Sequence, residues 1–140
     1  MSTLSAFFAN NVVSEVTQEV IVSDRFKGDN GKPIFWKIRG LSEGENSELR
    51  KAATKKVKGK GGVTTPEIDY ESYMTKMIVA SVVFPDLKEA DLQKSYGVIG
   101  ADDLLRKMLL AGEYGQLLQA VQSVNGFDQD INDLVEEVKN

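Results

Sequence analysis

The stretch from Asp69 to Phe84 constrains what this chain can fold into more than any other part of the sequence. The residues on its predicted inner side recur at three- and four-residue steps, which is the pattern of a half-buried helix. The predicted inner side comprises Tyr70, Tyr73, Met74, Met77, Ile78 and Ser81, and the outer side comprises Glu71, Ser72, Thr75 and Lys76. From Met77 onward the residues are predominantly apolar on every side, so we expect other parts of the protein to surround this half.

The flanks of the stretch set the predicted ends of this helix. Thr65, Pro66 and Glu67 supply a cap residue, a proline at the first helical position and an early carboxylate. Pro85 closes the far end. The alternative is a strand, because β-branched residues favour sheets. That strand would run through Ile78, Ala80, Val82 and Phe84. The length of the stretch and its capping signals favour the helix.

The composition sets limits on chemistry. With 140 residues the chain has the size of one ordinary domain, and we predict a single domain over residues 1–140. The absence of cysteine and histidine excludes disulfides, thiolate zinc sites, imidazole ligands and every mechanism that uses a Cys or His nucleophile. No stretch combines a nucleophile, a base and an oxyanion site. We therefore predict that the protein is not an enzyme and needs no cofactor.

Two ligand-binding motifs are present only in part. Asp128, Asp130 and Asn132 match the first three ligand positions of a calcium loop, but Asp133 stands where glycine is needed and Lys139 where a bidentate glutamate is needed. Residues 58–64 are rich in glycine and lysine, yet they lack the Gly-x4-Gly-Lys-Ser/Thr spacing of a phosphate loop. We predict neither a metal site nor a nucleotide site.

The sequence also predicts a soluble, cytoplasmic protein. Its first basic residue is Arg25, so the amino terminus lacks the charged region of a signal peptide. The apolar run from Met77 to Phe84 is too short to span a bilayer.

Residues 1–41 are predicted to hold a short helix and a β-hairpin. A helix from Thr3 to Val13 would place Leu4, Phe7 and Phe8 on one side, and we expect these side chains to pack against the body of the protein. Residues 16–23 and 34–39 alternate with period two around a turn-rich segment, as the strands of a hairpin do. The apolar side of the hairpin would carry Val16, Val20, Val22, Ile34, Trp36 and Ile38. A lone hairpin is marginal in water, so this side needs cover.

Residues 42–140 are predicted to be mainly helical. Ser42 and Glu45 have the spacing of a capping box at the start of a helix whose sparse apolar side continues to Val57. Residues 58–65 contain three glycines and are predicted to form a mobile loop.

Several short helices are predicted after Pro85, with breaks at Gly97, at Gly112 and at residues 125–126. The last of them would carry Ile131, Leu134, Val135 and Val138 on one side. The expected fold class is α+β, predominantly α-helical, with an N-terminal β-hairpin packed on a bundle of about five or six short helices.

Charge is distributed unevenly along the chain. The formal charge is −4, yet residues 50–60 hold six basic residues and no acidic one, which leaves −10 for the rest. We take this basic stretch as the candidate partner-binding site. It comprises Arg50, Lys51, Lys55, Lys56, Lys58 and Lys60. The alternative interpretation is a solvated helix end that leads into a flexible loop.

The chain resembles the XkdN-like group of phage tail assembly chaperones. The resemblance covers most of the chain and rests on short segments that occur in a fixed order. They are SDRFKGDNGKPIFWKIRGLSEGEN at residues 23–46, VVFPDLKEADLQKSYGV at residues 82–98, LLRKMLLAGEYGQLLQAVQSVNGF at residues 104–127, and a short acidic helix that ends in VKN.

This resemblance implies a non-enzymatic protein of the host cytoplasm. Such a chaperone binds the tape measure protein, keeps it soluble, brings major tail tube subunits to it and is absent from the mature virion. The resemblance implies no membrane partner, it leaves a homo-oligomer open, and it disfavours nucleic acid as a partner.

Two other functions fit some of the same residues. A small nucleic-acid-binding regulator could use residues 50–60, although a pI near 4.9 and the lack of aromatic residues among the lysines weigh against it. A minor structural tail protein is the third hypothesis, and it predicts that the protein is found in purified virions.

Overall fold

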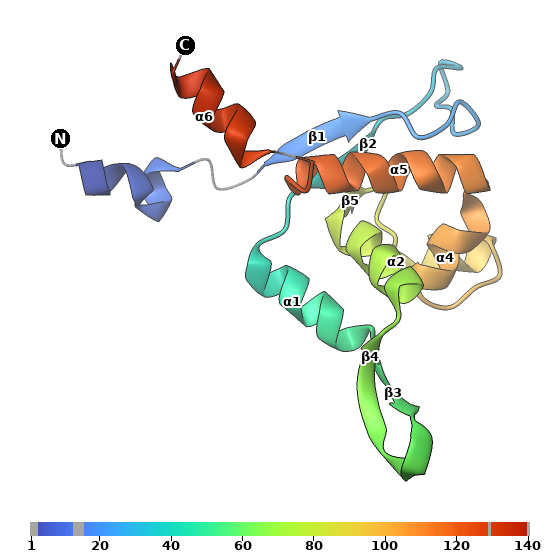
Figure 1. The fold of residues 1–140 in the computed structure, drawn as a ribbon. Coiled ribbons are helices and arrows are strands. Elements are labelled where there is room, and N and C mark those ends of the chain that lie inside the picture. Colours follow the sequence, from blue (N-terminus) through green and yellow to red (C-terminus); the bar gives the residue numbers. More distant parts are fainter. Residues whose placement is uncertain (1–2, 13–15, 129, 140) are drawn as a thin grey trace.

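The computed structural model describes residues 3–12, 16–128 and 130–139, without the side chain of residue 131 (Figure 1). Within these residues the α-helices are α1 (Glu43–Ala52), α2 (Tyr70–Ser81), α3 (Ala90–Ser95), α4 (Ala101–Met108), α5 (Ala111–Val124) and α6 (Ile131–Lys139). The strands are β1 (Thr17–Val20), β2 (Trp36–Arg39), β3 (Thr54–Lys58), β4 (Thr64–Ile68) and β5 (Val82–Phe84). This architecture confirms the predicted α+β, predominantly helical class.

Helix α2 lies at the centre of the molecule, as the sequence predicts. It packs against α1, α4, α5 and β5, and Figure 1 shows it beneath α5 with α1 and α4 on either side. Met77, Ile78 and Ser81 are each at most 1% exposed. The predominantly apolar second half of the helix is therefore covered except at Val79 and Ala80, which remain partly exposed.

Both predicted ends of this helix are wrong. Its cap residue is Asp69, whose side chain accepts a hydrogen bond from the Ser72 N–H at 3.1 Å. Thr65, Pro66 and Glu67 lie in β4 instead. At the far end the helix stops at Ser81, and residues 82–84 form a strand, so the strand alternative holds for this last part.

Two residues of α2 face opposite to their predicted sides. Thr75 is 2% exposed. Its hydroxyl forms hydrogen bonds with the Glu71 carbonyl oxygen at 3.2 Å and with the hydroxyl of Tyr114 on α5 at 2.8 Å. Its polar group is thus satisfied inside the protein. Tyr70, predicted to be inside, is 66% exposed.

The predicted N-terminal hairpin forms, with β1 and β2 antiparallel and Val20 opposite Trp36, but its strands are shorter than the predicted 16–23 and 34–39. Strand β5 adds to the other edge of β2, a third strand that the periodicity did not predict. Helix α5 packs against β1 and β2, and Trp36 and Ile38 are buried at 2% and 0% exposure. Val16 and Ile34 depart from the expected pattern because they are 53% and 40% exposed.

The region around the basic stretch differs most from expectation. The capping box of Ser42 and Glu45 is confirmed, but α1 ends at Ala52 rather than continuing to Val57. Strands β3 and β4 form a second hairpin where the sequence predicts a helix end and a mobile loop at 58–65. Its base is closed by a hydrogen bond of 2.9 Å from the Asp69 N–H to the Ala53 carbonyl oxygen. Gly61 and Gly62 adopt positive φ at its tip, which suits a tight turn.

The C-terminal helices follow the predicted order with one shift. Helix α4 ends at Met108 and α5 begins at Ala111, so Gly112 lies inside α5 rather than at the joint. The predicted stop is confirmed, since Asn125 caps α5 and Gly126 has a positive φ.

Asn125 also connects three elements. Its Oδ1 accepts from the Leu41 N–H before α1, and its Nδ2 donates to the buried Ser81 hydroxyl of α2 at 3.2 Å and to the Val121 carbonyl oxygen at 2.8 Å.

The two ends of the described chain contribute little to the core. Residues 3–7 and 9–11 form 3-10 helices rather than one helix, and the predicted end at Val13 lies outside the described residues. Leu4, Phe7 and Phe8 are 64%, 75% and 51% exposed, so the prediction that they pack against the body is wrong. All buried core residues of the described chain lie between Val22 and Val121 in the sequence, so neither end supplies one.

Replacement of Trp36 by alanine is expected to cost about 3 to 5 kcal/mol of the free energy of unfolding, because the side chain fills the space between the sheet and the helices. Urea unfolding followed by circular dichroism measures this cost. The wild-type protein is expected to show blue-shifted tryptophan emission. A water-like emission maximum in the folded protein would contradict the buried position.

Candidate functional site

The first half of the basic stretch is neutralised within the chain. At the end of α1, a terminal guanidinium nitrogen of Arg50 lies 3.2 Å from Glu43 Oε1, and Lys51 Nζ lies 3.4 Å from Glu48 Oε1. Hydrogen bonds from Arg50 are the main reason why the pKa of Glu43 is lowered. Lys55 lies 3.7 Å from Asp69, the cap residue of α2. These three basic residues are therefore paired with local carboxylates.

The second half of the stretch forms an open basic surface. Lys56 and Lys58 alternate with Val57 in β3, so they share one face of the hairpin. Opposite them on that face stand Pro66 and Thr64, whereas Lys55 stands opposite Glu67 on the other face.

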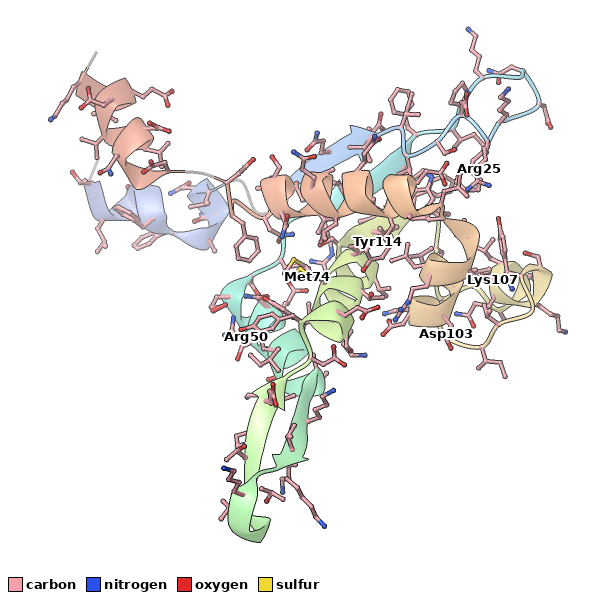
Figure 2. All side chains as sticks on the ribbon, turned by 45° about the vertical axis from the view of Figure 1, so that its right-hand side comes forward. Arg25, Arg50, Met74, Asp103, Lys107 and Tyr114 are labelled. Atoms are coloured by element: carbon pink, nitrogen blue, oxygen red, sulfur yellow. The ribbon has the colours of Figure 1, made fainter. Side chains whose placement is uncertain are left out.

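Lys60 follows at the tip. No ion pair is present between these three lysines and any other residue that the structure describes. We call Lys56, Lys58 and Lys60 the lysine face. Figure 1 shows the hairpin extending away from the body, and Figure 2 shows its side chains in the open around it.

A second surface, absent from the predicted site, is an apolar pocket of about 200 Å³ at the end of the three-stranded sheet. Its walls come from the segment between β1 and β2, from β2, from β5 and the proline after it, and from α3 and α4. The lining residues are Phe26, Ile34, Trp36, Phe84, Pro85, Leu92, Tyr96 and Met108.

The rim of this apolar pocket is open to solvent. Ile34 and Phe84 are 40% and 51% exposed, while Trp36 is buried and its ring centroid lies 6.0 Å from that of Phe26. A pocket of this size and lining suits one large apolar side chain of a partner. The alternation of residues 34–38 marked Ile34 and Trp36 as apolar, but no local pattern shows that five segments meet here.

An ion pair holds one wall of the apolar pocket in place. Arg25 donates to the Glu113 carboxylate of α5 from Nε at 3.1 Å and from one terminal nitrogen at 2.5 Å, and it also donates to the Met108 carbonyl oxygen at 3.0 Å. Figure 2 shows Arg25 beside the start of α5. The same carboxylate accepts from the Leu110 N–H at 2.8 Å, so it links Phe26 and its neighbours to the α4–α5 joint.

These hydrogen bonds change the acidity of Glu113. Those from Arg25 are the largest cause, and they lower the pKa of the Glu113 carboxyl to about 2. The pKa of Arg25 is raised in turn, chiefly by its hydrogen bond to Glu113.

Among the described residues, no group of three or more acidic residues is placed to hold a metal ion. The incomplete calcium motif is used locally, since Asp130 Oδ1 accepts from the Asn132 N–H at 2.8 Å. Within the same residues, no helix has both the length and the apolar character required to cross a bilayer.

Comparison with known proteins gives a consistent result. The family model described as "Phage XkdN-like tail assembly chaperone protein, TAC" matches residues 4–139. The Bacillus subtilis (strain 168) protein "Phage-like element PBSX protein XkdN" is 29% identical, with 98% of this chain and 93% of the relative covered. "Uncharacterized protein YqbN" of the same strain is 30% identical at the same coverage.

A crystal structure of the protein YqbN has the same fold. It superposes with a TM-score of 0.78 at 23% identity and covers 91% of this chain and 99% of that one.

Replacement of Glu113 by glutamine is expected to lower stability near neutral pH and to flatten its dependence on pH. Because the pKa of this carboxyl is lowered in the folded state, its contribution is complete above the unfolded value near 4.5 and is lost as pH falls toward about 2. Urea midpoints of wild type and variant should therefore converge between about pH 5 and pH 2. Glu136→Gln on α6 is the control. A constant difference at all pH values would contradict a stabilising role of the ion pair.

Proposed function

The chain belongs to the XkdN-like family of phage tail assembly chaperones, and we propose that it binds the tape measure protein, keeps it soluble and brings tail tube subunits to it. The apolar pocket carries this proposal, because a holdase needs apolar surface that stays open while the protein itself is folded. We place the activity in the host cytoplasm and outside the finished virion. The task is one of binding rather than catalysis.

The apolar pocket suits a helical client. A long helix presents apolar side chains at steps of three and four residues, and such side chains anchor a helix in an apolar recess. A recess of about 200 Å³ accepts one of these side chains at a time. Each copy of the chaperone would cover one apolar side chain of the client. Several bound copies would then keep the apolar side chains of different client molecules from associating.

The lysine face contributes charge rather than apolar contact. Exposed charges accelerate and orient association more than they add affinity. We propose that this surface meets an acidic surface of the tape measure protein or of a tube subunit. Arg50, Lys51 and Lys55 belong to the predicted site but serve local ion pairs first, so their share is smaller.

One observation favours nucleic acid as a second candidate partner. A two-stranded ribbon that carries unpaired lysines has the shape of elements that enter the major groove of DNA. Against this candidate, the rest of the chain carries −10 and would repel a polyanion from most directions. A structural role in the tail is tested by mass spectrometry of purified particles, in which this chaperone should be absent.

Ile34→Asp is expected to weaken binding to the tape measure protein by about tenfold or more, because it places a charge at the rim of the apolar pocket. The measurement is pull-down and solubility of the tape measure protein after co-expression. Ile99→Asp is the matched control, since Ile99 is 93% exposed and lies outside the pocket. Equal loss in both variants, or loss in neither, would contradict the pocket as the client site.

Reversal of Lys56, Lys58 and Lys60 to glutamate is expected to slow association with the tape measure or tube protein and to weaken its salt dependence. The fold should survive, because surface substitutions change stability by less than about 0.5 kcal/mol each. Reversal of the exposed Lys32, Lys88 and Lys94 gives the same change of net charge and serves as the control.

The same reversal separates protein binding from DNA binding. DNA binding would appear as an affinity whose logarithm falls steeply and linearly with the logarithm of salt concentration. If the wild type binds duplex in this way and tail assembly proceeds normally in the reversed variant, the nucleic-acid candidate replaces the electrostatic part of the proposal.

A further inference from the structure

Helix α6 is amphipathic, and its apolar side is uncovered. Leu134, Val135 and Val138 lie on one side of the helix and are 42%, 46% and 87% exposed. A helix of nine residues is marginal in water unless its apolar side packs against something. In this structure, α6 stands at the end of the chain away from the central helix α2 (Figure 1).

Beside that apolar side runs a row of carboxylates. Asp130, just before α6, and Asp133 and Glu137 within it are spaced by three and four residues, so they follow one another along one side. All three are exposed. None of them has an ion pair with a residue that the structure describes. The row spans about 10 Å along the helix axis, because each residue adds about 1.5 Å.

The lysine face has the opposite charge and a matching length. Alternate residues of a strand lie about 6.7 Å apart, so the amines of Lys56 and Lys58 are spaced like neighbouring carboxylates of the row on α6. Lys60 extends the charged surface to the tip.

The same face of the hairpin is also partly apolar. Pro66 stands opposite Lys56, and Ile68 stands opposite Thr54. Ile68 is partly buried against the core, whereas Pro66 is exposed. The hairpin therefore presents its lysines beside one exposed apolar residue, and charge is the main complement to α6.

We propose that α6 of one copy of this protein docks on the lysine face of a second copy. Opposite charges make the two surfaces complementary, and Pro66 gives the apolar side of α6 a contact beside the lysines. Figure 1 shows α6 and the hairpin at opposite ends of the molecule, so the two surfaces of one copy do not meet in this conformation. The contact joins different patches on the two copies, so a single contact is a heterologous interface. If each copy also docks its α6 on the lysine face of the other, the two contacts close a symmetric dimer.

This self-association bears on the binding of clients. A hairpin occupied by α6 of another copy is not free for an acidic client, so the two compete for the same lysines. The inference goes beyond the proposed function and does not require it, since α6 and the hairpin are complementary whether or not the tape measure protein is the client.

Complementary charge reversal tests the proposal on the full-length chain. One variant carries glutamate at Lys56, Lys58 and Lys60, and the other carries Asp133→Lys with Glu137→Lys. Sedimentation at low salt should show the wild type associated and each variant alone dissociated. An equimolar mixture of the two variants should associate again, because each supplies the surface that the other has lost. High salt should dissociate every form.

The control variant is Glu89→Lys with Asp91→Lys, which makes the same charge change on exposed residues before and within α3. It should associate as the wild type does. Far-UV circular dichroism checks that each variant is folded.

Three outcomes would overturn the proposal. They are a wild type that is monomeric at low salt, a hairpin variant that associates as the wild type does, and a mixture that fails to associate. None of these outcomes affects the solubility assay with the Ile34→Asp variant, so failure here is distinguishable from failure of the proposed function.

Discussion

The need to bury most of the apolar second half of α2 determines much of this fold. Met77, Ile78 and Ser81 are each at most 1% exposed, and α1, α4, α5 and the small sheet meet around this part of the helix. Only Val79 and Ala80, among the residues of α2 after Met77, remain partly exposed. Asn125 fixes the register of this assembly, because one side chain satisfies the buried hydroxyl of α2 and a backbone group before α1. An unsatisfied group at either place would cost about 1 to 3 kcal/mol.

The proposed binding surfaces lie at the edge of the core and outside it, where residues are not needed to cover α2. The apolar pocket forms at the edge of the core, where the segment anchored by Arg25 and Glu113 leaves Ile34 and Phe84 at an open rim. The lysine face lies on a hairpin that contributes little to the core, so its residues are free to serve a partner. The body thus carries the apolar pocket and the hairpin carries the lysine face, and substitutions of the exposed residues Ile34, Lys56, Lys58 or Lys60 can change binding while the core stays intact.

Sequence patterns correctly predicted the elements that depend only on neighbouring residues. The capping box of Ser42 and Glu45, the alternation around Trp36 and the stop at Asn125 and Gly126 each depend on residues within one turn or one strand. The basic hairpin was missed because both of its faces are largely in solvent, so its strands show no apolar alternation, and Pro66 stands where a helix start would also place it. The apolar pocket and the pairing of Lys55 with Asp69 depend on segments that meet only in the folded chain.

The most direct test of this account is an NMR titration with a soluble fragment of the tape measure protein. Trp36 is the single tryptophan of the chain and lines the apolar pocket, so its indole N–H gives one isolated signal that reports on the pocket. If the client uses the pocket, this signal and the amides of residues 26, 34 and 84 should shift together and saturate as the fragment is added. Binding that leaves the indole signal unchanged, with shifts confined to other surfaces, would contradict the account.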